Sequence, residues 1–379
     1  MGSTHGAMLW RSPENMKTAR TTVGRPLIGG LLFWGSVLVC AISFLSPARA
    51  QEVAELRAKA ESGDAVAQVR LGEAYRKGAG VPKNEELAYK WIRKAAEQGN
   101  AQAEDDLGTI YRLGEGVARD KNEAVHWYKK AAHHGSAAGM FNLGTCYYNG
   151  DGVSSNEYTA YVWFLLAQEA GNPIASDAVN RSADTMSRID VAEALVQIGD
   201  MYDKGEEVPR DELRAMTWLR KGAEKSYQGK VRLAFQLLKV SDGSLHYKEA
   251  SELCKSAAHS YAPAQRCLGY FYRIGMGVPH DPSEAVKWYK KAADQNDPPA
   301  LFELAAMYEL GEGTSIDYPD AFIAYFRAGR LGVPMAYHKA ISLWRRMNKE
   351  DQAKTSRQLR ARSFDPDKVI AVLEALPPS

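Results

Sequence analysis

GDAVAQVRLGEAYRKGAGVPKNEELAYKWIRKAAEQG, residues 63–99, is the first copy of a pattern that occurs three times before residue 171. Leucine, tyrosine and tryptophan return in it at intervals of 36 residues. The recurring positions are Leu71, Leu107 and Leu143; Tyr75, Tyr111 and Tyr147; and Trp91, Trp127 and Trp163. A fixed period of this size indicates a stack of small supersecondary units that lean on one another, rather than one globular core.

Each unit predicts a helix, a loop and a second helix. Leu71 and Tyr75 fall at helical spacing on one face of the first helix. Gly78 follows its last turn, where a left-handed residue closes a helix without steric cost. Asn84 stands where an N-cap belongs, and Trp91 lies on the apolar stripe of the second helix. Such a hairpin cannot bury its stripe alone, so stacking on neighbours has to bury it.

The N-cap position is filled by Asp or Asn in five later units. Its occupants are Asp120, Asn156, Asp211, Asp281 and Asp317. Asp120 with Glu123, and Asp281 with Glu284, have the spacing of a capping box, in which two side chains satisfy each other's free N–H groups. The local chemistry of the helix starts therefore agrees with the periodicity.

These residues resemble the Sel-one-like repeat family, a relative of the tetratricopeptide repeat, over about three quarters of the chain. The resemblance implies an all-α fold, a right-handed α/α superhelical solenoid of about seven hairpins. It also implies a scaffold or adaptor for other proteins, without naming the partner.

The period breaks once, because 55 residues separate Trp163 from Trp218, 19 more than one repeat. The excess predicts one extra helix over residues 174–186, and its sequence resembles the segment that closes arrays in this family. We therefore expect two tandem arrays, residues 51–189 and 190–379, the second ending in cap helices. The alternative is one array carrying a long loop.

The N-terminus has a different composition. Residues 27–45 carry no charge, Lys17, Arg20 and Arg25 precede them, and Ala48-Arg49-Ala50 resembles a cleavage site. This layout predicts a signal peptide over residues 1–50, cleaved near Ala50, and a periplasmic or secreted product. The alternative is an uncleaved anchor in the inner membrane, since 19 apolar residues can just span a bilayer. Both interpretations export the repeats.

One surface row is the candidate site for a protein partner. The residue before each leucine faces away from the core stripe of the first helix, and it changes in sign and shape along the array. The row is Arg70, Asp106, Asn142, Gln197, Arg232, Cys267 and Glu303. This variation is what a concave surface that binds an extended partner would show, and it is also what any solvated helix face shows.

Of the four cysteines, Cys40 lies in the predicted signal segment, so three remain in the exported chain. Cys146 occupies a position otherwise filled by apolar residues, which predicts a core residue. Cys254 and Cys267 lie symmetrically about a turn, at one height across an antiparallel helix pair. A disulfide is possible there if their Cα atoms approach within about 7 Å. The alternative is two unlinked thiols.

Composition and motifs argue against other functions. A formal net charge of +2 lacks the basic excess of a nucleic-acid-binding surface. The sequence has no catalytic serine motif and no phosphate-binding loop. His126, His133 and His134 share a helix without a convincing metal-ligand set, and we expect no metal and no cofactor. We therefore favour a non-enzymatic scaffold, and the family resemblance implies regulation of envelope signalling or polysaccharide export as one variant. The alternative is a cell-wall hydrolase or penicillin-binding protein.

Overall fold

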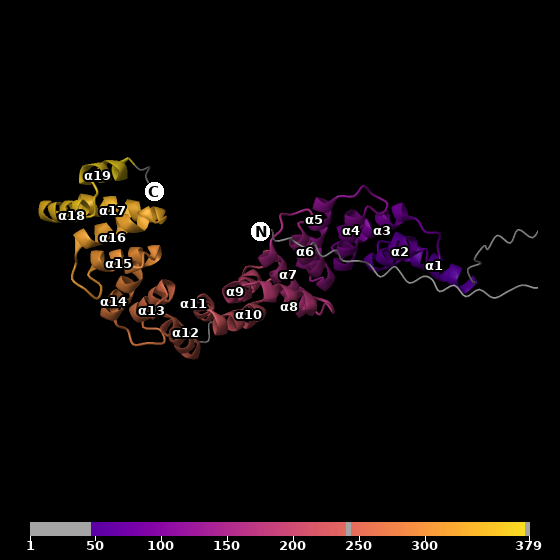
Figure 1. Cartoon of the computed structure of the whole chain (residues 1–379), viewed down its shortest axis with the longest axis horizontal. Coiled ribbons are helices and arrows are strands. Elements are labelled where there is room, and N and C mark those ends of the chain that lie inside the picture. The colour runs from indigo at the N-terminus through magenta and orange to yellow at the C-terminus, as the bar shows by residue number, and fades with distance from the viewer. Residues whose placement is uncertain (1–46, 240–243, 376–379) are drawn as a thin grey trace, which may run out of the picture. The chain divides into compact units, whose positions relative to one another are not determined.

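The computed structural model describes residues 47–239 and 244–375, which form nineteen α-helices and no strand (Figure 1). Fourteen of these helices pair into seven hairpins. The first helices are α2 (Ala65–Lys77), α4 (Ala101–Leu113), α6 (Ala137–Asn149), α9 (Arg188–Lys204), α11 (Tyr227–Leu237), α13 (Ala262–Ile274) and α15 (Pro298–Leu310). The second helices are α3 (Glu85–Glu97), α5 (Lys121–His133), α7 (Glu157–Glu169), α10 (Glu212–Lys225), α12 (Ser244–Ala257), α14 (Pro282–Asp294) and α16 (Tyr318–Arg330). The predicted all-α solenoid of about seven hairpins is confirmed.

Five helices lie outside the hairpins. They are α1 (Pro47–Glu61), α8 (Ala175–Thr185), α17 (Pro334–Arg346), α18 (Lys349–Ala361) and α19 (Pro366–Glu374). Helix α1 covers the first hairpin, and Gln68 of α2 donates a hydrogen bond to the carbonyl of Ala60 at 3.0 Å. At the other end, Trp344 of α17 packs against Phe322, so the cap helices cover the last hairpin.

The loop inside a hairpin is closed by one repeated backbone hydrogen bond. The N–H of Asn84 donates to the carbonyl of Tyr75 at 2.9 Å, and the same bond recurs at the five later caps. The cap side chains also bind the first turn as predicted; the Asn84 amide oxygen accepts from the N–H of Leu87. Only half of each predicted capping box forms. The carboxylates of Asp120 and Asp281 accept from the N–H groups of Glu123 and Glu284, but the N–H groups of Asp120 and Asp281 donate to the carbonyls of Tyr111 and Tyr272. The carboxylate of Glu123 instead accepts from the Trp127 indole at 3.0 Å.

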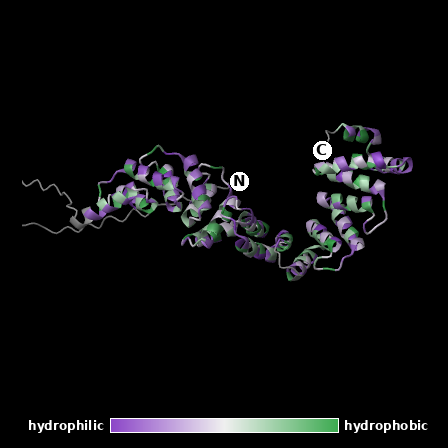
Figure 2. Cartoon of the chain, turned by 180° about the vertical axis from the view of Figure 1, so that it is seen from behind, coloured by the Kyte–Doolittle hydropathy of each residue, from purple (hydrophilic) through white to green (hydrophobic). Residues whose placement is uncertain are grey.

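Within a hairpin, a glycine on the first helix faces a large residue 20 positions later. A Cβ added to Gly108 would lie 2.7 Å from the ring of Tyr128. The same relation holds between Gly144 and Phe164, where the distance is also 2.7 Å. The glycine therefore lets the two helices pack closely around one buried side chain. Figure 2 shows that apolar and polar residues alternate around the helices.

Between hairpins, the second glycine of the loop makes the close contact. Gly152 has a φ of +74°, and a Cβ there would lie 2.2 Å from the carbonyl oxygen of Lys121, in the first turn of the preceding second helix. Gly313 meets the carbonyl of Pro282 at 2.2 Å in the same way. The Gly-x-Gly loop thus turns the chain and also seats each hairpin on its predecessor.

The stack is interrupted once, after α7. The extra helix predicted over residues 174–186 is confirmed as α8, which packs on α7 through Ala175, Ala178 and Val179. Its end is held by the Thr185 hydroxyl, which donates to the carboxylate of Glu157 at 3.1 Å. Helix α8 is inserted between the third and the fourth hairpin. The contact between α7 and α9 therefore differs from the contact between a second helix and the next first helix elsewhere in the stack.

The predicted signal or anchor segment, residues 27–45, lies outside the described residues. Among the helices that the structure does describe, none is long and apolar enough to cross a membrane.

Candidate protein-interaction surface

The predicted row lies on what we call the first-helix face, the surface that carries Arg70, Glu73, Asp106, Asn142, Gln197, Asp200, Arg232, Arg273 and Glu303. Arg70 is exposed, whereas Asp106, Asn142 and Gln197 are half-buried. Cys267 departs from the prediction: it occupies a row position but is fully buried. The row is therefore a partly recessed surface rather than a free helix edge.

Three row residues bind the first helix of the preceding hairpin. The Asn142 amide donates to the carboxylate of Asp105 at 2.7 Å. Arg232 forms an ion pair with Asp200. These contacts join neighbouring repeats, so the variation along the row has a structural use besides any role in binding.

Glu303 makes the third of these contacts. It accepts a hydrogen bond from Arg273 at 2.7 Å, and Arg273 also pairs with Glu312 of the loop in Glu303's own hairpin. The side chains at this point are committed to each other, so a partner that binds here has to fit a surface of paired charges.

The second hairpin concentrates acid on the first-helix face. Asp105 is 6% exposed, and burial raises the pKa of its carboxyl group. Burial, with the nearby carboxylates of Glu73 and Asp105, raises the pKa of Asp106 to about 6. Gln102 donates to Asp106 at 3.1 Å, which offsets part of this effect. A basic group brought to this place would relieve the repulsion.

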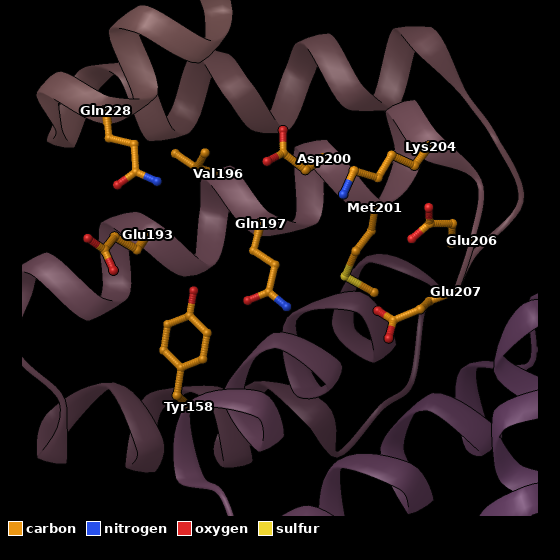
Figure 3. Close-up of a pocket in the computed structure, with 10 residues that line it drawn as sticks. All are labelled: Tyr158, Glu193, Val196, Gln197, Asp200, Met201, Lys204, Glu206, Glu207 and Gln228. Carbon is orange, nitrogen blue, oxygen red and sulfur yellow. The ribbon is translucent and has the colours of Figure 1, made fainter. Parts of the chain in front are cut away.

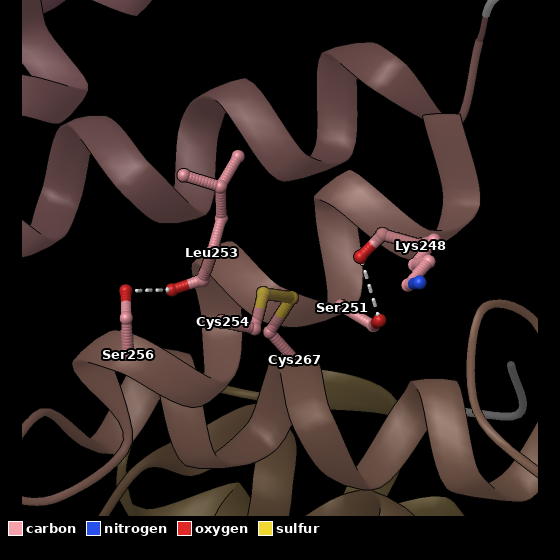
Figure 4. The surroundings of a disulfide bond; sticks show 6 residues. All are labelled: Lys248, Ser251, Leu253, Cys254, Ser256 and Cys267. Atoms are coloured by element: carbon pink, nitrogen blue, oxygen red, sulfur yellow. Dashed lines mark hydrogen bonds between the residues drawn. A yellow bond between two sulfur atoms is a disulfide. The ribbon is translucent and has the colours of Figure 1, made fainter. Parts of the chain in front are cut away.

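Cys254 and Cys267 form a disulfide that joins α12 to α13 (Figure 4). Their Cα atoms are 6.0 Å apart, within the range that a disulfide requires, and both residues are fully buried. The bond links the fifth hairpin, whose loop lacks the Gly-x-Gly pattern, to the sixth. Cys146 is also buried, as predicted, and carries a free thiol.

A pocket of about 370 Å³ opens on the first-helix face at α9 (Figure 3). We call it the junction pocket. Its lining is Tyr158, Glu193, Val196, Gln197, Asp200, Met201, Lys204, Glu206, Glu207 and Gln228. Six of these residues follow one another at helical spacing along one side of α9. Gln197 of the predicted row is among them, so the sequence located one wall of the pocket but not the cavity.

The junction pocket lies where a loop would otherwise meet the preceding hairpin. In the fourth hairpin, Glu207 stands at the position of the second loop glycine, as the alignment with Gly152 and Val153 shows. Tyr158 directly follows Glu157, whose carbonyl corresponds to that of Lys121. Because the loop of the fourth hairpin does not pack on the first turn of α7, position 207 does not require a glycine. The pocket lies between α7, α9 and α11, next to the place where α8 interrupts the repeats, and no feature of a single repeat reveals it.

The three histidines do not gather into a metal site. His134 Nδ1 lies 2.7 Å from the carboxylate of Glu104, which is buried at 1% exposure. The corresponding positions of the first hairpin hold Gln68 and Gln98, which bond to each other at 2.7 Å. The Glu104–His134 pair therefore takes the same place in the stack as the Gln68–Gln98 pair, which indicates a structural role for it. Within residues 47–239 and 244–375, no three His, Cys, Asp or Glu side chains are grouped as metal ligands.

Comparison with known sequences places these features in a family. The model of the Sel1 repeat matches residues 65–100, 101–136, 137–172, 192–227, 262–297 and 298–333, more than half of the chain. The two gaps between matched stretches correspond to α8 and to the fifth hairpin, which is degenerate in sequence yet keeps its two helices.

Two curated relatives match only in part. Chitin synthase regulatory factor 3 of Schizosaccharomyces pombe is 32% identical over 117 residues, which are 29% of this chain and 12% of that protein. An uncharacterised protein of Neisseria meningitidis is 32% identical over 111 residues, 29% of this chain and 22% of that protein. The chain thus spans less than a quarter of the length of these two relatives.

Two solved structures show similar repeats. One is a protective antigen of uropathogenic Escherichia coli with an SLR fold; it is 26% identical, covers 87% of this chain and 75% of its own, and has a TM-score of 0.44. A Sel1 repeat protein of Oxalobacter formigenes is 26% identical, covers 77% of this chain and 80% of its own, and has a TM-score of 0.36. Because the family model matches most of the hairpins seen here, this chain belongs to the Sel1 repeat family, whose members generally act as scaffolds for protein–protein interaction.

Proposed function

We propose that this chain is an exported, non-enzymatic scaffold that binds a protein partner along its first-helix face. The observation that carries the proposal is the contrast between constant and variable positions. The buried apolar residues of the hairpins repeat from unit to unit, whereas Arg70, Asp106 and Gln197 share one position and differ in charge. The junction pocket interrupts the same face and adds a recess to it.

Position-specific crosslinking tests this proposal. A photo-reactive amino acid at Arg70 or Gln197 should crosslink the full chain to one partner protein in envelope extract. Matched substitutions at Lys90 and Lys290, exposed residues of α3 and α14, should give little of that product. Equal crosslinking from both helix sets, or none from either, would count against the first-helix face as the binding surface.

Export is the second part of the proposal. It is supported by the uncharged residues 27–45, their basic flank and the sequence Ala48-Arg49-Ala50. The buried disulfide is also what an oxidising compartment permits. Residues 1–50 fused to alkaline phosphatase should give an active, exported enzyme. N-terminal sequencing of the exported full chain should begin at Gln51 after cleavage, whereas an intact N-terminus would indicate the anchor.

A regulatory role in polysaccharide synthesis or export is the variant that we favour. One relative is named as a regulatory factor of chitin synthase, an enzyme that makes a polysaccharide, and it is 32% identical to this chain over 117 residues. Deletion of the gene should then change the amount of exported polysaccharide, and the crosslinked partner should belong to the machinery that makes it. An unchanged polysaccharide level would restrict the proposal to a scaffold of another assembly.

A further inference from the structure

We propose that the junction pocket receives a lysine or arginine side chain from the protein bound along the first-helix face. This inference rests on the scaffold function proposed above and gives the chemistry of one contact. The pocket lies where two neighbouring repeats would otherwise touch. In other repeats a loop glycine makes that contact, as Gly116 does against the carbonyl of Glu85. Where Glu207 replaces that glycine, the space is left to a group from outside.

The charge of the lining selects a cation. Glu193, Asp200, Glu206 and Glu207 contribute four carboxylates, and Lys204 contributes one ammonium group. Asp200 is already paired with Arg232 at the pocket's edge. Three carboxylates therefore remain for one lysine, and an entering cation would reduce their mutual repulsion. An acidic or phosphorylated partner side chain would be repelled by these carboxylates.

The depth of the pocket suits a side chain with an apolar stem. Val196 is 1% exposed and Met201 is 6% exposed, and the two lie on the same side of α9 as the carboxylates. Figure 3 shows Tyr158 of α7 on the opposite wall, with its hydroxyl directed toward Gln197. Methylene groups can pack on Met201 and the Tyr158 ring, while the charged head reaches the carboxylates of the loop.

Burial and the nearby carboxylates of Glu193 and Asp190 raise the pKa of Tyr158 to about 12. The phenol therefore stays neutral, and it can donate or accept a hydrogen bond without competing for the cation. Gln197 and Gln228 add neutral amides to the same lining. The pocket thus offers an apolar wall, neutral polar groups and a surplus of negative charge.

The test uses three short peptides and the full chain. Blocked Gly-Arg-Gly, Gly-Lys-Gly and Gly-citrulline-Gly are titrated into protein with ¹³C-labelled methionine methyl groups, at low salt. Citrulline has the shape of arginine without its charge. We expect the basic peptides to shift the Met201 resonance and to bind about tenfold more tightly than the citrulline peptide. The resonance of Met307, fully buried in α15, should not move.

A charge variant supplies the second arm. Glu193→Gln, Glu206→Gln and Glu207→Gln together should weaken the binding of the arginine peptide about tenfold. The control is Glu52→Gln, Glu350→Gln and Glu374→Gln, which removes the same number of charges from exposed positions in other helices. Equal binding of arginine and citrulline, or equal loss in both triple variants, would overturn the proposal.

The outcome is separable from that of the scaffold proposal. If crosslinking finds a partner but the peptides do not shift Met201, the scaffold stands and the basic contact is wrong. If the peptides bind but no partner is crosslinked at Arg70 or Gln197, the pocket is a cation site and the first-helix face is not the partner-binding surface.

Discussion

Small residues and their partners set the spacing between helices. The glycine that follows the repeated leucine faces a large side chain 20 residues later, as Gly108 faces Tyr128. The fifth hairpin has Ala234 at this position, and the residue 20 places on is Cys254. In this hairpin a larger residue on one helix is paired with a smaller one on the other, which preserves the packed volume, whereas the seventh hairpin pairs Ala305 with Tyr325. The sulfur that takes the smaller place forms the disulfide.

The loop glycines give a residue-scale prediction. Gly152→Ala would place a Cβ 2.2 Å from a backbone carbonyl and would strain a φ of +74°. Gly171→Ala would strain a φ of +87° with nothing within 4 Å. We expect the second change to cost about 1 kcal/mol and the first about 3 kcal/mol or more. Thermal unfolding of both variants measures the difference, and similar melting temperatures would show that this contact does not hold the hairpins together.

Asp106 gives a second prediction at this scale. The pKa of its carboxyl group is raised to about 6 in the folded chain, from an ordinary value of 3.8. The folded state therefore binds more protons than the unfolded chain, and this group's contribution to stability falls as pH rises from about 4 to about 6. Asp106→Asn should remove that fall and raise stability near neutral pH by about 1–2 kcal/mol.

Melting temperatures at acid and neutral pH measure the Asp106 effect. Asp184→Asn, at an exposed position of α8, is the matched control and should leave the pH dependence unchanged. An Asp106→Asn variant that keeps the wild-type pH dependence would show that other groups cause it.

Local chemistry was predictable where it depends on neighbours in sequence. The caps at Asn84 and Asp120 and the left-handed Gly78 all follow from residue type and position. The second half of the capping box did not form at Asp120, because the carbonyl of Tyr111 lies close enough to take the N–H of Asp120. That competitor lies nine residues earlier in the chain, beyond the reach of a motif four residues long.

At the scale of the element, α8 was predictable and the junction pocket was not. An interval 19 residues too long, with helical spacing inside it, requires an additional helix. The pocket depends on Tyr158, Gln197 and Gln228, which come from three different helices. Their distances follow from how the hairpins on either side of α8 pack, and a repeat pattern carries no information about that.

The disulfide gives the prediction for the elements α12 and α13. Cys254 and Cys267 are separated by 13 residues, and a crosslink that closes a loop of this size stabilises by about 3 kcal/mol in the chain-entropy model. Dithiothreitol should therefore lower the melting temperature of the wild-type chain. It should have no effect on a Cys254→Ala, Cys267→Ala variant, which should already melt at the lower temperature. A wild-type transition that does not respond to reductant would contradict the prediction.

At the scale of the whole chain, the two-array organisation stays a prediction. The buried residues bear on whether two such arrays could have separate cores. One apolar cluster contains Phe164 of α7 and Val179 of α8 together with Ile198 of α9 and Trp218 of α10. The proposed boundary between residues 189 and 190 therefore passes through a shared core. The sequence located the interruption of the repeats, but it could not tell that packing continues across it.

The shared core predicts that the second array depends on the first. In a fragment of residues 190–379, the amides of α9 should exchange with solvent at least about tenfold faster than in the full chain. The amides of α15 and α16, far from the cut in sequence, should exchange as before. Equal protection of α9 in both proteins would make the arrays independent domains.

The bond between Asn84 and Tyr75, repeated in the later hairpins, has a consequence for how such a chain can change its length. Residues added between the two helices of a hairpin would pull the donor away from its acceptor. The turn from one hairpin to the next is closed by a shorter bond, as between the N–H of Asn172 and the carbonyl of Ala167, and that bond is kept where α8 follows. The chain has accommodated α8 at a turn of that kind. These turns are therefore the places where evolution, or an engineer inserting a tag or a foreign epitope, can lengthen the protein at the least cost.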